Sequence, residues 1–99
     1  MNNFPKWEKS YKMRIIARAT LRNFWQKPNY ADAEQPLKVW FDEAKKANWE
    51  TPQDIKNVYR NASFVGSNRV VFNIHGTKSR LIVAINYPAQ IIFIRFIGT

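Results

Sequence analysis

Residues 68–97 read NRVVFNIHGTKSRLIVAINYPAQIIFIRFI, and this stretch decides the fold. Three runs rich in β-branched and aromatic residues are separated by two turn signals, HGTK at 75–78 and NYPA at 86–89. β-Branched and aromatic residues favour strands, whereas glycine, proline and asparagine between such runs favour turns. The pattern therefore predicts a three-stranded antiparallel meander.

Turn positions set which residues of the meander lie opposite one another. With Gly76 and Thr77 at the first tip, Asn73 lies opposite Arg80, and Arg69 lies opposite Ala84. A second turn about Pro88 places Arg80 opposite Arg95.

Side chains alternate between the two faces of a strand, so this register predicts two different faces. The expected cationic face carries Arg69, Asn73, His75, Lys78, Arg80 and Arg95. The expected core face carries Val70, Phe72, Ile74, Leu81, Val83, Ile85, Ile92, Ile94 and Phe96. A one-residue slip in either turn would exchange the faces of a whole strand.

Two arginines directly opposite each other repel, and such a pair is destabilising. The sequence supplies no carboxylate near them, and a bound polyanion would relieve the repulsion. The alternative is that Arg80 and Arg95 are simply solvated.

Upstream of the meander the pattern is helical, after a short strand candidate at residues 13–18. A first helix is expected after Thr20 and a second from about Gln35, where Pro36 is tolerated in the first turn. Thr51 followed by Pro52 predicts the start of a third helix. We therefore expect a single α+β domain, with two to three helices on one side of the meander.

The composition excludes several classes of site. The chain of 99 residues has no cysteine and a single histidine, His75, so neither a disulfide framework nor a usual zinc site is expected, and no cofactor is indicated. No apolar run reaches the length of a membrane span, and the N-terminus shows no signal region. We expect a cytoplasmic protein whose residues 1–12 form a loosely ordered basic extension to a domain at 13–99.

The distribution of charge favours a polyanionic partner. Residues 1–54 hold ten Lys and Arg against seven Asp and Glu, whereas residues 55–99 hold six Lys and Arg and no acidic residue. An acid-free half of a small domain fits attraction to phosphates, which makes nucleic acid the favoured partner. An acidic protein partner and a charge that serves only solubility are the alternatives.

The residues available on the cationic face suit cleavage of RNA without a metal. The 2′-OH of RNA attacks the adjacent phosphorus while a base takes its proton and cations stabilise the phosphate. Arg80 and Arg95 suit the phosphate clamp, Lys78 is a further catalytic candidate, and His75 is the candidate base. The predicted RNA-binding residues are Arg69, Asn73, Lys56 and Arg60.

These residues also carry a family resemblance. VFNIHGTKSRLIV at 71–83 and FIRFIGT at 93–99 resemble the C-terminal core of HigB-type toxins, in the RelE/ParE superfamily of toxin–antitoxin modules. LRNFW at 21–25, PL at 36–37 and WETP at 49–52 are also similar, so that the resemblance covers residues 13–99. It implies a RelE-like fold, metal-independent cleavage of mRNA on the ribosome, and neutralisation by a HigA-type helix-turn-helix antitoxin.

The resemblance fails at the C-terminal end. In the family, the stretch matching residues 94–99 runs on into a histidine and then a Tyr-Asp pair of the active site, whereas this chain stops at Thr99. We expect a truncated form that keeps the fold and the RNA affinity but cleaves poorly or not at all. Two rival functions share the same basic face: a non-catalytic RNA- or DNA-binding module, and a ParE-like gyrase poison.

Overall fold

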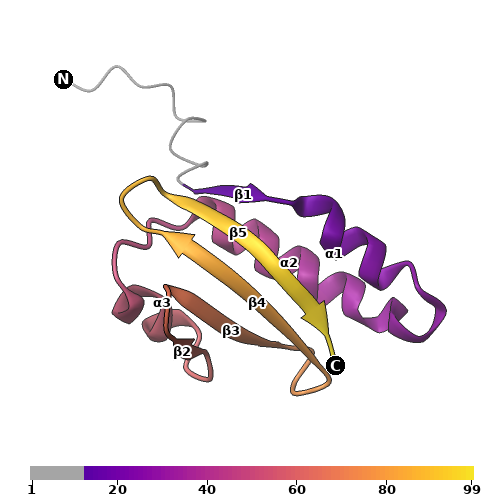
Figure 1. Cartoon of the computed structure of the whole chain (residues 1–99). Coiled ribbons are helices and arrows are strands. Elements are labelled where there is room, and N and C mark those ends of the chain that lie inside the picture. Colours follow the sequence, from indigo (N-terminus) through magenta and orange to yellow (C-terminus); the bar gives the residue numbers. More distant parts are fainter. Residues whose placement is uncertain (1–12) are drawn as a thin grey trace.

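Five strands form one sheet in the computed structural model, which describes residues 13–99 (Figure 1). The strands are β1 (Arg14–Ile16), β2 (Ser63–Val65), β3 (Arg69–Ile74), β4 (Ser79–Asn86) and β5 (Ile91–Gly98). Their order across the sheet is β1-β5-β4-β3-β2. The extension predicted for residues 1–12 lies outside the described residues.

The predicted meander is confirmed as β3, β4 and β5, but the expectation of a three-stranded sheet is wrong. β2 adds to the free edge of β3 in antiparallel orientation, and β1 adds to β5 in parallel orientation. The sheet is therefore mixed and has five strands. β1 can run parallel to β5 because the three helices between them in sequence carry the chain back across one face.

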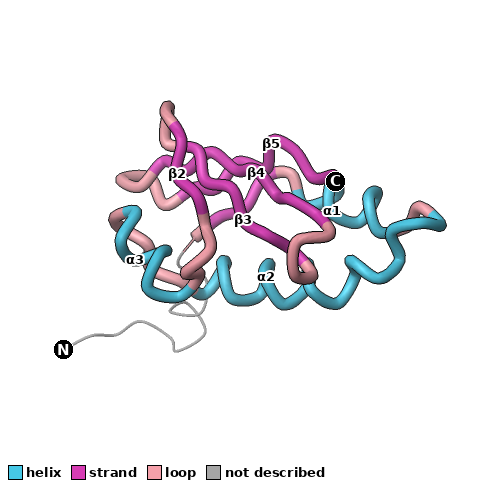
Figure 2. Tube along the Cα trace, turned by 90° about the horizontal axis from the view of Figure 1, so that it is seen from below, coloured by secondary structure: helices cyan, strands magenta, loops and turns pink. Residues whose placement is uncertain are grey.

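The helices of the described chain lie on one face of the sheet and leave the other face bare (Figures 1 and 2). They are α1 (Arg18–Trp25), α2 (Glu34–Lys46) and α3 (Pro52–Val58), with a 3-10 segment η2 (Pro28–Ala33) between α1 and α2. The prediction that Thr20 caps the first helix is wrong. Extended Ala17, which follows β1 directly, is the N-cap residue and makes no side-chain cap bond.

The start of α3 confirms the sequence prediction. Thr51 has extended backbone angles and Pro52 occupies the first helical turn. The Thr51 hydroxyl accepts a hydrogen bond from Asp54 N at 3.3 Å, while the Asp54 carboxylate accepts one from Thr51 N at 3.2 Å. This reciprocal pair satisfies two backbone donors that a helix start otherwise leaves open.

The core lies between the helices and the inner face of the sheet. Its largest fully buried side chains include Trp40 of α2, Leu21 of α1, Ile55 of α3, and Phe72 of β3. Phe72 lies at the centre of an aromatic cluster, because its ring contacts those of Trp40, Trp49 and Tyr59 at centroid distances of 5.4, 6.1 and 5.1 Å. The expected core residues of the meander are buried, with the single exception of Phe96.

The predicted register holds in the first hairpin but fails in the second. Arg69 pairs with Ala84 and Asn73 with Arg80, as expected. In the second hairpin Arg80 pairs with Gly98, not with Arg95. The chain turns through four residues, 87–90, with Gln90 in the left-handed region at φ 58°, so that pairing resumes only at Asn86 and Ile91.

A β-bulge then shifts the register once more. Val83 pairs with Ile94, but the next residue, Ile82, pairs with Phe96, so Arg95 is the extra residue. Phe96 is displaced from the expected core face and is 47% exposed. A bulge re-aims the side chains that follow it, which explains why strict alternation misplaced this ring.

We predict that Thr51→Ala lowers the free energy of unfolding by about 1 kcal/mol, because one cap hydrogen bond is lost. Urea denaturation followed by circular dichroism measures this change. Gln53→Ala is the matched control on the same helix: it removes one exposed hydrogen bond, to Asn57, and should change the free energy by less than about 0.5 kcal/mol. Equal losses in the two variants would contradict the capping role.

Candidate functional site

The bare face of the sheet, which we term the outer face, is the candidate site (Figure 2). Its side chains come from alternate positions of the strands, except at the bulge, where Arg95 and Phe96 are adjacent: Arg14, Ile16, Arg69, Val71, Asn73, Arg80, Ile82, Ala84, Phe93, Arg95 and Phe96. Half-buried aliphatic and aromatic groups form its floor, and four exposed arginines rise from it. The outer face therefore combines positive charge with apolar surface.

Among residues 13–99, the arginines of the outer face have no carboxylate partner. Within residues 13–99, no ion pair involves Arg14, Arg69, Arg80 or Arg95. Every side-chain carboxylate of this part of the chain comes from residues 32–54, the segment that supplies the helical layer. The positive charge of the outer face is thus available to an external anion.

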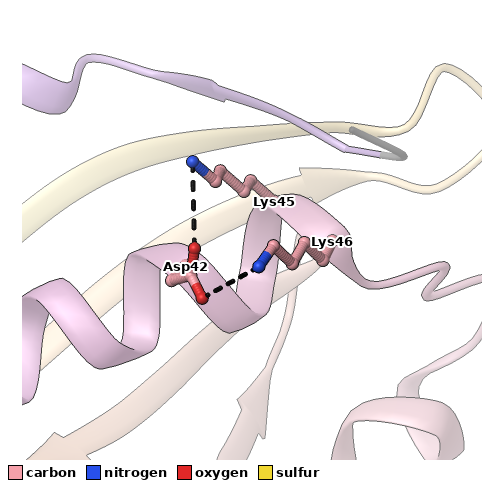
Figure 3. A network of polar contacts seen from close by, with 3 residues as sticks. All are labelled: Asp42, Lys45 and Lys46. Carbon is pink, nitrogen blue, oxygen red and sulfur yellow. Dashed lines mark hydrogen bonds and ion pairs between the residues drawn. The ribbon is translucent and has the colours of Figure 1, made fainter. Parts of the chain in front are cut away.

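The helical layer differs, because two of its acids pair with lysines of the same helix, α2. Asp42 contacts Lys45 at 3.8 Å and Lys46 at 3.3 Å, both within the same helix (Figure 3). Glu34 contacts Lys38 at 2.6 Å. Exposed pairs of this kind contribute no more than about 1 kcal/mol each, but they balance charge on this side of the molecule.

Arg80 and Arg95 share the outer face without facing each other. Arg80 lies on the rung of Gly98, and Arg95 lies at the bulge beside Ile82 and Val83. The Arg95 guanidinium packs over the Phe93 ring, 5.3 Å from its centroid. Since a guanidinium stacked on a ring keeps its in-plane donors free, this contact orients Arg95 for anion binding.

His75 and Lys78 do not join the outer face, and the expectation that they would is wrong. They lie in the β3–β4 turn, where strand alternation stops and His75 adopts a φ of 54°. Lys78 Nζ donates to Asp32 Oδ2 of η2 at 2.7 Å, and His75 Nδ1 lies 3.6 Å from the same oxygen. Both side chains therefore lean toward the helical layer.

The hydrogen bond from Lys78, together with the charges of Lys78 and His75, holds the pKa of Asp32 below its usual value of 3.8. Asp32 is thus ionised at neutral pH, and it anchors the turn through the side chains of Lys78 and His75. A catalytic role for His75 or Lys78 stays a prediction, and it would require each of them to turn away from Asp32.

The remaining predicted RNA-binding residues are spread over the molecule. Arg69 and Asn73 lie on the outer face, as expected. Arg60 lines a hollow with Asn61, Asn73 and Gly76, beside the end of β3. Lys56 of α3 does not reach the outer face, because its ammonium donates to the Ala62 carbonyl at 2.8 Å.

Two residues of the outer face were missed as site candidates by sequence reasoning. Arg14, on β1, joins through the parallel pairing with Ile91 of β5. Phe96 joins through the bulge. The pairing of Arg14 with Ile91 joins residues 77 positions apart, and the bulge at Arg95 interrupts a strand without a turn residue. Neither feature leaves a local sequence pattern, so composition and alternation could not place Arg14 or Phe96 on the outer face.

Residues 13–99 hold neither a cluster of metal-ligating side chains nor a membrane-spanning helix. No group of three or more His, Cys, Asp or Glu residues is gathered there in an arrangement that could hold a metal ion. Nor does this part of the chain contain a helix with the length and apolar character needed to cross a membrane.

A comparison with protein families gives one match. Residues 33–99 match the model of the HigB_toxin family, described as a RelE-like toxic component of a toxin–antitoxin system. The match spans α2, α3 and strands β2 to β5, and so includes most of the outer face. A search of curated proteins found no match.

We predict that the carboxyl group of Asp32 titrates below 3.8 and that Lys78→Met raises its midpoint toward 3.8. A carboxylate with a lowered pKa contributes stability above its unfolded-state pKa, and this contribution is lost as the pH falls through its folded-state pKa. NMR of the side-chain carboxyl carbon measures the midpoint. His75→Ala should raise it less, because the hydrogen bond from Lys78 is the main cause. An unchanged midpoint in Lys78→Met would rule out the ion pair in solution.

Proposed function

Since the chain belongs to the HigB family of RelE-like toxins of toxin–antitoxin systems, we propose that it is a toxin that cleaves mRNA on the ribosome. The observation that carries this proposal is the outer face. Four arginines without ion-pair partners in the described chain stand there on an apolar floor. Phosphates complement the charge, and unpaired bases complement the floor.

Cleavage would use the RNA's own 2′-hydroxyl as nucleophile. Its oxygen attacks the adjacent phosphorus, the bond to the 5′-oxygen of the next nucleotide breaks, and that oxygen takes up a proton. Arg80 and Arg95 would stabilise the negative charge that develops on the phosphate, because guanidinium groups bind two phosphate oxygens at once. None of these steps calls for a metal ion.

His75 is the proposed base and Lys78 an additional cation. Both lie in the turn that joins β3 to β4, next to the end of β4 that carries Arg80. Their contacts with Asp32 are exposed, and such exposed pairs exchange readily with other partners. An arriving phosphate could therefore compete with Asp32 for Lys78.

A non-catalytic RNA- or DNA-binding module is the second candidate. The observation that favours it is the separation of the two arginines from His75 and Lys78, which contact Asp32 in the helical layer. In this case the same outer face would hold nucleic acid without cutting it.

The family also implies an antitoxin partner. We propose that this partner is of the HigA type, a helix-turn-helix repressor, and that it neutralises the toxin by denying RNA the outer face. Because ribosomes translate mRNA in the bacterial cytoplasm, we propose that the toxin acts there.

We predict that the double variant Arg80→Ala/Arg95→Ala relieves the growth arrest that cleavage by the expressed chain causes, because the phosphate clamp is lost. Strong arrest by the parent chain would contradict the expectation that this form cleaves poorly, and its absence would agree with that expectation. Colony counts after induction measure the effect. Circular dichroism of the purified variant checks that the fold is intact. New ends in mRNA from arrested cells, mapped by primer extension, would identify cleavage.

The matched control is Arg22→Ala/Lys27→Ala, which removes the same charge from exposed positions in and just after α1. It should leave the arrest intact. Arrest with uncut mRNA would favour the non-catalytic module, and arrest with broken DNA would favour a ParE-like gyrase poison. Equal relief by both double variants would show that net charge, and not the outer face, is responsible.

A further inference from the structure

Phe96 stands on the outer face because of the bulge at Arg95. Its ring would be buried in a regular strand, since its neighbours Ile92 and Ile94 point into the core. The bulge instead pairs Phe96 with Ile82 of the outer face and leaves 47% of the side chain exposed. Exposing a phenylalanine ring loses the free energy that burying its apolar surface would give. Such an exposed ring among cations suggests a ligand.

Gly98 fixes where the ring lies. A methyl group at position 98 would meet Cζ of Phe96 at 2.5 Å and Cε2 at 3.0 Å, far closer than carbon atoms approach. The distal end of the ring therefore occupies the space that a side chain at position 98 would fill. The backbone of β5 supports the ring from below, and its exposed part points to the solvent.

Arginines flank this ring. Arg80 lies directly opposite Gly98, over which the far end of the ring lies, and Arg95 precedes Phe96 at the bulge. The guanidinium group of Arg95 packs over the neighbouring ring of Phe93. The register thus places Phe96 next to two arginine positions, Arg80 and Arg95, in a sheet that has no acidic residue.

This arrangement suits an unpaired nucleotide. Aromatic rings stack on every base with little sequence preference, and cations beside the ring bind the flanking phosphates. A base inside a duplex is already stacked on its neighbours, so its faces are closed to the ring. We propose that Phe96, supported by Gly98, is a stacking platform for an unpaired nucleobase, so that the outer face selects single-stranded over double-stranded RNA. This inference rests on the proposed function.

The test measures the affinity of the purified 99-residue chain for a short unpaired RNA and for a duplex of the same length, by fluorescence anisotropy at several salt concentrations. Phe96→Ala should weaken binding of the unpaired RNA about tenfold, as expected for the loss of one base–aromatic stack. Binding of the duplex should be unchanged. Melting temperatures confirm that each variant is folded.

Salt dependence separates stacking from phosphate contact. Phe96→Ala should leave the slope of log affinity against log salt concentration unchanged, because the ring neutralises no phosphate. Arg80→Ala should make the slope shallower by about 0.7, the value for one phosphate contact on a single strand.

Two further variants test the requirement for an aromatic ring. Phe96→Tyr should keep the affinity for unpaired RNA, whereas Phe96→Leu should lose it, although leucine still covers Gly98. Phe64→Ala is the matched control, because Phe64 is also exposed, at 37%, but pairs with the inward-facing Val70 and lies near Lys56. It should bind unpaired RNA as the parent does.

Full affinity in Phe96→Leu, or equal losses for duplex and unpaired RNA, would overturn the stacking role. Unchanged affinity in Phe96→Ala, together with a large loss in Arg80→Ala/Arg95→Ala, would reject the platform but keep the RNA-binding face. If the parent chain binds no RNA even at low salt, the proposed function fails along with the platform. In that case Phe96 would be better explained as a contact for a protein partner.

Discussion

The structure depends on burying one face of a twisted sheet under helices. Val70, Phe72, Leu81, Val83 and Ile92 present a continuous apolar surface on alternate positions, and each is at most 1% exposed. The large rings of Trp40 and Trp49 fill the space between this surface and the helical layer. Because the helices of residues 13–99 lie on only one face, this part of the chain leaves the intervening positions uncovered. The arginines stand at these positions, so the same alternation that builds the core also builds the cationic surface.

Charge is sorted between the two layers. The acidic residues of the described chain lie in η2, α2 and α3 or in the loop before α3, and Glu34 and Asp42 pair with lysines of α2. In contrast, the sheet contains arginines and no acid. Individual exposed ion pairs are weak, so this sorting contributes little to folding. It does produce a face of one sign, and a field of one sign attracts polyanions from solution.

Much of the fold could be predicted from the sequence, because its signals are local. The turn at Gly76 set the first hairpin, and Thr51 with Pro52 set the start of α3. The second hairpin was predicted as such, but its register was not, because the length of the turn at 87–90 and the bulge at Arg95 leave no mark in the nearly uniform apolar run Ile91–Ile97. Two further features depend on tertiary packing. One is the bulge at Arg95, and the other is the contact of Lys78 with Asp32, 46 residues away. These long-range features decide which site residues meet: Arg80 and Arg95 share a face, but His75 and Lys78 leave it.

The most direct measurement is an NMR titration of the ¹⁵N-labelled chain with a short unpaired RNA. We expect the largest amide shifts in β4 and β5 around Arg80, Arg95 and Phe96, with smaller shifts at Arg69 and none in α1 and α2. The shifts should fade as the salt concentration rises. Shifts confined to the helical layer, or no shifts at low salt, would contradict the central claim that the bare face of the sheet binds RNA.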